Sequence, residues 1–301
     1  MIKIQYPDTS VFNNPNSVWY HYLLSGFKEL GEVTISKELG KQSHYITGFT
    51  VLAIDIDIDG KKTRVWYDFC DFLPIHTDIM SDGDLYFKIM CHKDYPIKYK
   101  NVYPIGQTTA SMNYFKMLPN LRSNVKKDSY AHDVVAIFRA TNYKLRRKCI
   151  EIIKAQKNWN ALSGLCFFRN RPEIPKELMT EKLPFGVHLE RQSNSRICVS
   201  LSGVGGDAGL CWRETEVLGM GGCLLNIESK CLRPGDTEHY KNNCQITIKD
   251  DLSNLVEQVN YYLEHTEERK QIARNGLDYF NKYLTPKAMA TNIINRVREN
   301  L

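Results

Sequence analysis

The chain has 301 residues, of which 43% are hydrophobic and 25% charged, and this composition allows a sizeable core in one large domain or two ordinary ones. No apolar run reaches the roughly 18–20 residues that would cross a bilayer, and the polar N-terminus lacks the apolar region of a signal peptide. We therefore expect a cytoplasmic protein without a transmembrane segment.

The first part of the chain predicts a mixed α/β domain. Residues 17–31 have the pattern of an amphipathic helix that ends at a glycine. Residues 45–72 predict two strands joined at Asp59-Gly60, a strong hairpin signal. Further short strands are expected at residues 84–91 and 101–106. We place the boundary of this N-terminal domain, residues 1–127, in the polar stretch 122–133.

The run IDIDIDG (54–60) within that hairpin also resembles the start of a calcium-binding loop. The twelfth position of such a loop would be Trp66 instead of glutamate, so the loop is incomplete. Alternating isoleucine and aspartate is typical of a strand with one buried face. We interpret the run as a strand.

The second part of the chain, residues 128–301, alternates strands with helices. The expected strands are residues 133–140, 160–168, 196–201, 223–227 and 245–250. Helices are expected at 143–158 and 212–222, and the chain is expected to be helical after residue 250. Repeated strand–helix–strand units predict a parallel sheet covered by helices on both faces. Ligands of such sheets bind at the carboxyl ends of the strands.

Cysteine usage and charge narrow the options further. The nine cysteines form no Cys-x-x-Cys pair, and Cys149, Cys166, Cys198 and Cys223 lie in apolar runs, as buried free thiols do. The net charge is +6, with basic clusters at residues 92–100, 122–127 and 144–148. These clusters form either a solvated surface or a site for an anionic partner: a nucleotide diphosphate, a phospholipid surface or nucleic acid.

The segment SLSGVGGDAGLCWRE (200–214) contains four glycines between a predicted buried strand and a helix: Gly203, Gly205, Gly206 and Gly209. Glycines let backbone amides approach a ligand, and a helix N-terminus favours an anion such as a diphosphate. The spacing matches neither the dinucleotide-binding nor the P-loop pattern. The alternative is a glycine-rich turn without a ligand.

Arg213 and Glu216 lie three residues apart at the start of the following helix. A carboxylate here can accept two ribose hydroxyls, and a guanidinium can bind phosphate. The same spacing is also that of an ion pair on a helix surface. Spacing does not distinguish the two.

The run ICVSLSGVGGDAGLCWRETEVLGMGGCLL (197–225) resembles the donor-binding region of GT-B-fold glycosyltransferases of group 1. Glu216 occupies the position of the family's ribose-binding glutamate. The segment FRATNYK resembles the family's arginine followed five residues later by lysine, which makes Arg139 and Lys144 candidate diphosphate ligands. The tail, residues 251–297, is similar to the family's closing helices, and the resemblance covers roughly residues 133–300.

The resemblance implies a GT-B fold with two Rossmann-like α/β domains facing across a cleft, the last helix returning to the first domain. It implies transfer of a hexose or pentose from a nucleotide diphosphate sugar, such as a UDP-sugar, to an acceptor hydroxyl, with no resident cofactor and no metal. Amides at Gly203, Gly205 and Gly206 and the Arg213 side chain would hold the diphosphate. His188 is a candidate for lining the nucleobase pocket, the alternative being a loop histidine in water. The acceptor would be a glycan, a lipid-linked glycan or DNA.

One position departs from the family pattern. Many retaining members carry a second glutamate eight residues before the ribose glutamate, where this chain has Ala208 beside Asp207. Asp207 is a candidate substitute. The catalytic-base candidates lie near predicted strand ends in the first domain, namely Asp68, Asp71, His76 and His92, of which we select His92.

Two rival functions remain open. The same fold could glycosylate hydroxymethylated bases of phage DNA, because the basic face could bind DNA. The missing glutamate at position 208 instead suggests a module that binds nucleotide sugar or glycan without turnover. The D-x-D pairs at 55–59, which hold a metal in another glycosyltransferase fold, fit better as part of the strand.

Overall fold

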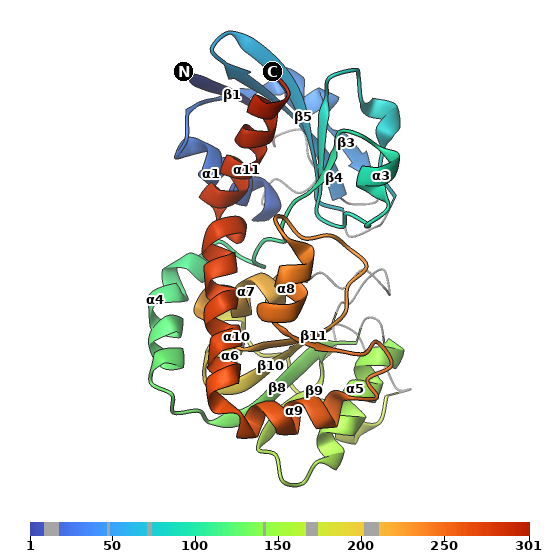
Figure 1. Ribbon diagram of the computed structural model, residues 1–301, viewed down its shortest axis with the longest axis vertical. Coiled ribbons are helices and arrows are strands. Elements are labelled where there is room, and N and C mark those ends of the chain that lie inside the picture. The colour runs from blue at the N-terminus through green and yellow to red at the C-terminus, as the bar shows by residue number, and fades with distance from the viewer. Residues whose placement is uncertain (9–17, 47–48, 71–73, 141–142, 167–173, 202–210) are drawn as a thin grey trace. The chain divides into compact units, whose positions relative to one another are not determined.

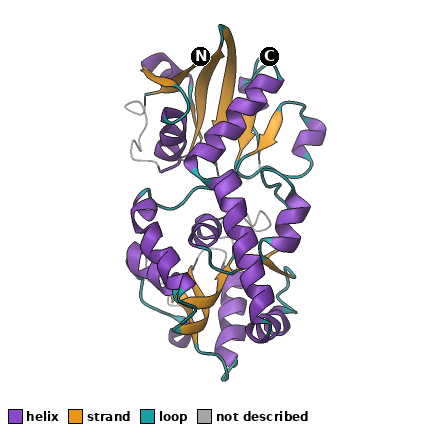
Figure 2. Ribbon diagram, turned by 60° about the vertical axis from the view of Figure 1, so that its left-hand side comes forward, coloured by secondary structure: helices purple, strands orange, loops and turns teal. Residues whose placement is uncertain are grey.

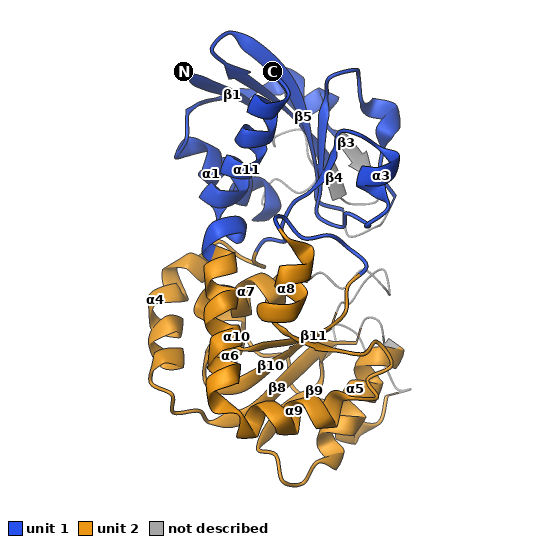
Figure 3. Ribbon diagram, in the orientation of Figure 1, with its two compact units in different colours: residues 1–108, 230–235, 281–301 blue, residues 109–229, 236–280 orange. Residues whose placement is uncertain are grey.

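The computed structural model describes residues 1–8, 18–46, 49–70, 74–140, 143–166, 174–201 and 211–301. The chain divides into two units (Figure 3). Unit 1 consists of residues 1–108, 230–235 and 281–301, and unit 2 of residues 109–229 and 236–280. Both units are therefore discontinuous in sequence, and residues 281–301 belong to unit 1.

Unit 1 is built on a seven-stranded sheet (Figure 1). In chain order its strands are β1 (Ile2–Pro7), β2 (Glu32–Ser36), β3 (His44–Ile46), β4 (Phe49–Ile58), β5 (Lys61–Asp68), β6 (Leu85–Lys88) and β7 (Val102–Pro104). The spatial order is β2-β1-β4-β5-β6-β7, with β3 beside β4. Strands β5, β6 and β7 run parallel, whereas β4 is antiparallel to β1, β3 and β5. The sheet is mixed.

The β4–β5 hairpin confirms the strand interpretation of the aspartate run. Asp59 and Gly60 both have positive φ, 52° and 86°, as a two-residue turn of type I′ requires. Ile54 and Ile56 are buried, and Asp55 forms ion pairs with Lys62 and Arg64 of β5 (for the first, Nζ to Oδ2 is 2.8 Å). The Asp55 oxygens are thus used within the hairpin.

The helices of unit 1 are α1 (Val18–Lys28), α2 (Lys37–Gln42), α3 (Tyr95–Lys98) and α11 (Pro286–Glu299). Helices α1 and α11 pack together although they lie at opposite ends of the sequence. Gly26 makes this approach possible, because a Cβ there would lie 2.0 Å from the carbonyl oxygen of Pro286. A π-helical turn, Phe280–Leu284, joins α11 to the preceding helix.

Unit 2 is built on a parallel sheet of β8 (His132–Arg139), β9 (Ala161–Cys166), β10 (Ser195–Ser200), β11 (Leu224–Ile227) and β12 (Ile246–Ile248). Its helices are α4 (Asn113–Lys126), α5 (Tyr143–Ala155), α6 (Phe185–Ser193), α7 (Trp212–Met220), α8 (Thr237–Asn243), α9 (Leu255–Glu264) and α10 (Thr266–Tyr279). Figure 2 shows these helices packed around the strands. The predicted alternation of strand and helix is confirmed.

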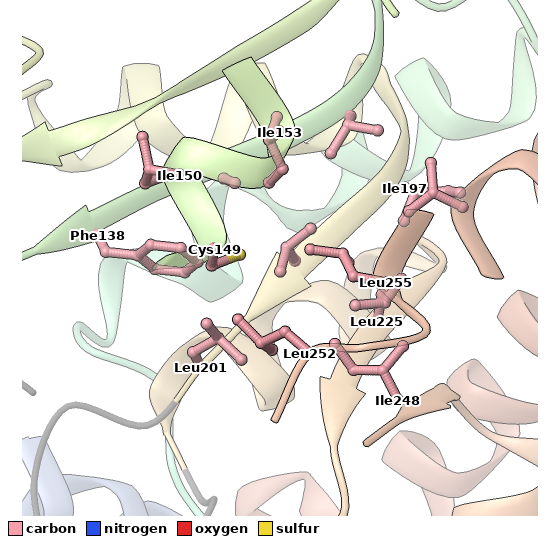
Figure 4. Close-up of a cluster of buried hydrophobic side chains, with 14 of the residues drawn as sticks. Phe138, Cys149, Ile150, Ile153, Ile197, Leu201, Leu225, Ile248, Leu252 and Leu255 are labelled. Atoms are coloured by element: carbon pink, nitrogen blue, oxygen red, sulfur yellow. The ribbon is translucent and has the colours of Figure 1, made fainter. Parts of the chain in front are cut away.

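The core of unit 2 explains why its strands are continuous apolar runs. Side chains from β8, β10, β11 and β12 meet those of α5 and of the start of α9 (Figure 4). Helix α5 contributes Cys149, Ile150 and Ile153, all fully buried. The four cysteines expected to be buried thiols are buried, and burial raises the pKa of each: Cys149, Cys166, Cys198 and Cys223.

Helix α4 lies where the sequence predicted a boundary. The sequence predicts a domain boundary between residues 127 and 128, but the division between units 1 and 2 falls after Thr108. The buried side chains Tyr114, Leu118 and Leu121 recur at helical spacing, and the helix packs on α6 and α7 of unit 2. The polar stretch 122–133 contains the last residues of this helix, the turn that follows it and the start of β8.

Packing between α4, α7 and α10 leaves no room for a side chain at Gly219. A Cβ there would lie 2.4 Å from the Tyr114 hydroxyl oxygen and 2.7 Å from the Phe280 ring. We therefore expect Gly219→Ala to lower the free energy of unfolding by about 1–3 kcal/mol in a urea titration. The control is Gly186→Ala in α6, where the new Cβ would meet only the flexible end of Met117 at 3.1 Å. Equal stability of the two variants would contradict this packing.

Within the described part of the chain, every helix is too short or too polar to span a bilayer.

Candidate functional site

The topology of unit 2 marks one edge of its sheet as a ligand site. The strand order is β12-β11-β10-β8-β9. From β8 the chain continues to β9 on one side of β8, and the later strands β10, β11 and β12 lie in sequence on its other side. In parallel sheets, ligands bind outside the carboxyl ends of the strands at such a switch point. Here those ends are Arg139 of β8 and Ser200 of β10. The glycine loop directly follows β10.

Two arginines hold this edge together around one aromatic ring. Arg213, in the first turn of α7, donates from Nη2 to the Ile137 carbonyl oxygen at 2.7 Å. Arg146 of α5 donates from Nη1 to the Arg139 carbonyl oxygen at 2.8 Å. The two guanidinium carbons lie 5.2 Å and 5.3 Å from the centre of the Phe138 ring, within cation–π distance.

The carboxyl ends of β8 and β9 collect positive charge. Burial, together with the charges of Arg213 and Arg139, lowers the pKa of Arg146 to about 10. At the end of β9, burial raises the pKa of the Cys166 thiol. Three cations oppose that rise and therefore lie near the thiol: Arg139, Arg213 and Lys182. An anionic ligand would be stabilised at this edge.

Glu216 lies inside unit 2, on α7, and is only 4% exposed. Its Oε1 accepts the backbone N–H of Ala110 at 2.8 Å. Burial raises the pKa of the carboxyl to about 6, opposed by the Ala110 N–H and the Arg213 charge. The alternative of a surface ion pair is therefore wrong, because Glu216 is buried and Arg213 bonds a carbonyl.

The other residues predicted to bind the sugar donor differ from Glu216 in how far they are buried. Arg139 and Lys144 are exposed, at the end of β8 and in the first turn of α5. His188, on α6, is half-buried, and burial together with the Arg213 charge lowers its pKa to about 3, so its ring is neutral at pH 7. The structure thus brings His188, Arg213 and Glu216 together. Gly203, Gly205, Gly206 and Asp207 lie outside the described residues.

The catalytic-base candidates belong to unit 1. His92 is half-buried, pairs with Cys231 in a short antiparallel bridge, and has Nδ1 at 3.2 Å from Asp94 Oδ2. Its role as a base stays a prediction. Asp68, at the end of β5, is fully buried and bonded to Lys88, which makes it unsuitable as a solvent-facing base. Asp71 lies outside the described residues.

Arg146 is not among the residues expected at the site, because residues 144–148 form a run of cations in which no single side chain stands out. The helical period contains the missing signal. Arg146, Ile150 and Ile153 are spaced at i, i+4 and i+7, which places the arginine on the buried face of α5.

Residues 146–295 match the model of a protein family described as glycosyl transferase-like. The matched segment contains α7 with Arg213 and Glu216, as well as His188 and the closing helices. The chain belongs to this glycosyltransferase family. Arg139 and Lys144 immediately precede the matched segment.

One solved structure supports the fold, and a second lies just below it in similarity. A glycosyltransferase from Rickettsia africae ESF-5 has a TM-score of 0.50 at 11% identity, over 78% of this chain and 70% of that protein. Anabaena Alr3699/HepE, crystallised with UDP and glucose, has a TM-score of 0.49 at 10% identity, over 74% of this chain and 65% of that protein. The expected GT-B fold is confirmed. A search of curated proteins finds no match.

Proposed function

We propose that this glycosyltransferase family member transfers a hexose or pentose from a nucleotide diphosphate sugar to an acceptor hydroxyl. The observation that carries the proposal is the arrangement at the carboxyl ends of β8 and β10, where three arginines lie near one another and a buried carboxylate lies on α7. The arginines would recognise phosphate, and the buried carboxylate would recognise ribose hydroxyls.

Each residue of the site has a proposed role. The exposed side chains of Arg139 and Lys144 bind the diphosphate. Glu216 uses Oε1 for the Ala110 N–H, which leaves Oε2 to accept the ribose hydroxyls. His188, neutral at pH 7, lines the nucleobase pocket, for which uracil is our first choice.

In the reaction, the acceptor hydroxyl oxygen forms a bond to the anomeric carbon as the bond from that carbon to the diphosphate oxygen breaks. The hydroxyl proton passes to a base, for which His92 and Asp207 are the candidates. Negative charge develops on the leaving diphosphate, and the arginines and Lys144 stabilise it. Fixed cations can replace a metal ion in this role, so we propose that the reaction requires none.

A panel of UDP-, GDP- and ADP-sugars tests this function. We expect one nucleotide series to raise the melting temperature, because a ligand at 100 times its Kd stabilises the folded state by about 2.7 kcal/mol. We also expect slow release of the nucleoside diphosphate from the matching sugar donor. Stabilisation by none of them would overturn the proposal, and binding without release would make the protein a non-catalytic module.

The exposed cations provide matched variants for that experiment. Arg139→Ala with Lys144→Ala should abolish most of the thermal shift and leave the unliganded melting temperature unchanged, because both side chains are exposed. Lys157→Ala is the control. It removes an equally exposed lysine from the turn after α5, at the opposite edge of the sheet. A full thermal shift in the double variant would remove these residues from the site.

A further inference from the structure

Arg146 is a buried cation on the apolar face of α5. Its side chain belongs to a residue only 6% exposed, on the same helix face as Ile150 and Ile153. Burying a guanidinium is costly unless hydrogen bonds and favourable charges compensate for the lost water. Its presence among core side chains therefore needs a structural reason.

The hydrogen bonds of Arg146 supply that reason. Nη1 donates to the carbonyl oxygen of Arg139 at 2.8 Å, and Nη2 donates to the carbonyl oxygen of Leu201 at 2.5 Å. Arg139 is the last residue of β8, and Leu201 is the first residue after β10. The Arg146 side chain thus links the end of β8 to the end of β10, the two strands that flank the switch point.

The same cation also contributes charge to the site. Its guanidinium carbon lies 5.3 Å from the centre of the Phe138 ring, and Arg213 lies at 5.2 Å from that ring. Arg213 and Arg139 repel it, which is one of the causes of its lowered pKa. Cations held close together are stabilised when an anion binds nearby.

We propose that Arg146 is a positioning residue for the diphosphate: it fixes the exit points of β8 and β10 relative to each other and supports the anion without contacting it. This inference rests on the proposed function. The rigid guanidinium bonds the two carbonyls from two separate nitrogens, whereas a lysine carries all three of its donors on one nitrogen at the end of a flexible chain. The geometric role therefore predicts that lysine will not replace arginine here.

The test compares Arg146→Met and Arg146→Lys with the wild type by calorimetry, using UDP and UMP. We expect both variants to bind UDP at least about tenfold more weakly, and UMP less than about threefold more weakly, because the second phosphate depends most on the cations. Amide hydrogen exchange at Ala140, whose N–H bonds the Cys166 carbonyl in the wild type, should be faster in both variants.

The control is Arg147→Met. Its guanidinium pairs with Glu151 at 2.6 Å on the surface of the same helix, so UDP binding should be unchanged. Should Arg146→Met not fold, Arg146→Lys alone decides the question. UDP affinity equal to wild type in the lysine variant would overturn the positioning role. If the wild type binds none of UDP, GDP and ADP, the proposed function fails and this inference fails with it; if it prefers GDP or ADP, that nucleotide and its monophosphate replace UDP and UMP.

Discussion

Glu216→Gln is expected to weaken donor binding and, at the same time, to stabilise the protein. The carboxylate oxygen that would accept the ribose hydroxyls is replaced by an amide NH2, and losing a hydrogen bond to a charged acceptor costs about 1.5–3 kcal/mol of binding free energy. The fold should persist, because the glutamine oxygen can still accept the Ala110 N–H. Calorimetry with the preferred nucleoside diphosphate measures the first effect.

The stability gain follows from the pKa of Glu216, which burial raises from 4.5 to about 6. A raised carboxyl pKa means that the folded state favours the neutral form. The stabilisation that the neutral carboxyl gives the folded state is complete below pH 4.5 and is lost as the pH rises through 6. A shift of this size corresponds to about 2 kcal/mol. Glutamine resembles the neutral carboxyl, so Glu216→Gln should be more stable than the wild type at pH 8 and equal to it at pH 4.

Urea titrations at the two pH values check this prediction, with Glu190→Gln, an exposed glutamate of α6, as the control. Donor binding supplies a second check. The ratio of wild-type to variant affinity should fall as the pH is lowered through 6, and taking the ratio cancels the titration of the diphosphate itself. A pH-independent stability difference would show that burial of the charge is not its cause.

Lys88→Met is expected to cause the largest loss of stability, about 3–5 kcal/mol. Lys88 Nζ lies 2.8 Å from Asp68 Oδ2, and both side chains are 0% exposed. Asp68 also accepts the Tyr86 hydroxyl at 2.6 Å and the Cys70 N–H at 2.8 Å. Removing the lysine leaves a carboxylate buried in unit 1 without its cation. Chemical denaturation followed by fluorescence measures the loss.

Two further variants separate the pair from general effects. Lys41→Met removes one partner of an exposed pair with Glu38, at 3.8 Å, and should change stability by less than about 0.5 kcal/mol. Adding Asp68→Leu to Lys88→Met should recover much of the loss, because the uncompensated charge is gone. If Lys88→Met costs no more than Lys41→Met, the buried pair does not stabilise unit 1.

The fold was most predictable from sequence where the spacing of apolar residues and the residues of the turns indicated the same element. Asp59-Gly60 specified its hairpin because both residues tolerate positive φ. The strands of unit 2 were recognisable because both faces of a parallel sheet are buried. Helix α4 was missed because only three of its side chains are buried, Tyr114, Leu118 and Leu121, and its exposed end is polar.

The sequence predicted which types of residue form the site but not their hydrogen-bond partners. Glu216 was found through family resemblance, but spacing gave no sign that Ala110, more than 100 residues earlier, would donate to its carboxylate. Arg146 was hidden in a run of cations, because a charged residue is normally assigned to the surface. Long-range partners of this kind depend on tertiary packing, which local pattern does not contain.

The packing of α1 against α11 has a consequence for biosynthesis. Ribosomes make residues 1–108 before unit 2, yet the helix that packs on α1 is Pro286–Glu299, which begins 178 residues after Thr108 (286 − 108). The segments of unit 2 end at Phe280 and have therefore all emerged before α11 is available. Synthesis of unit 1 thus begins before that of unit 2 and is completed after it.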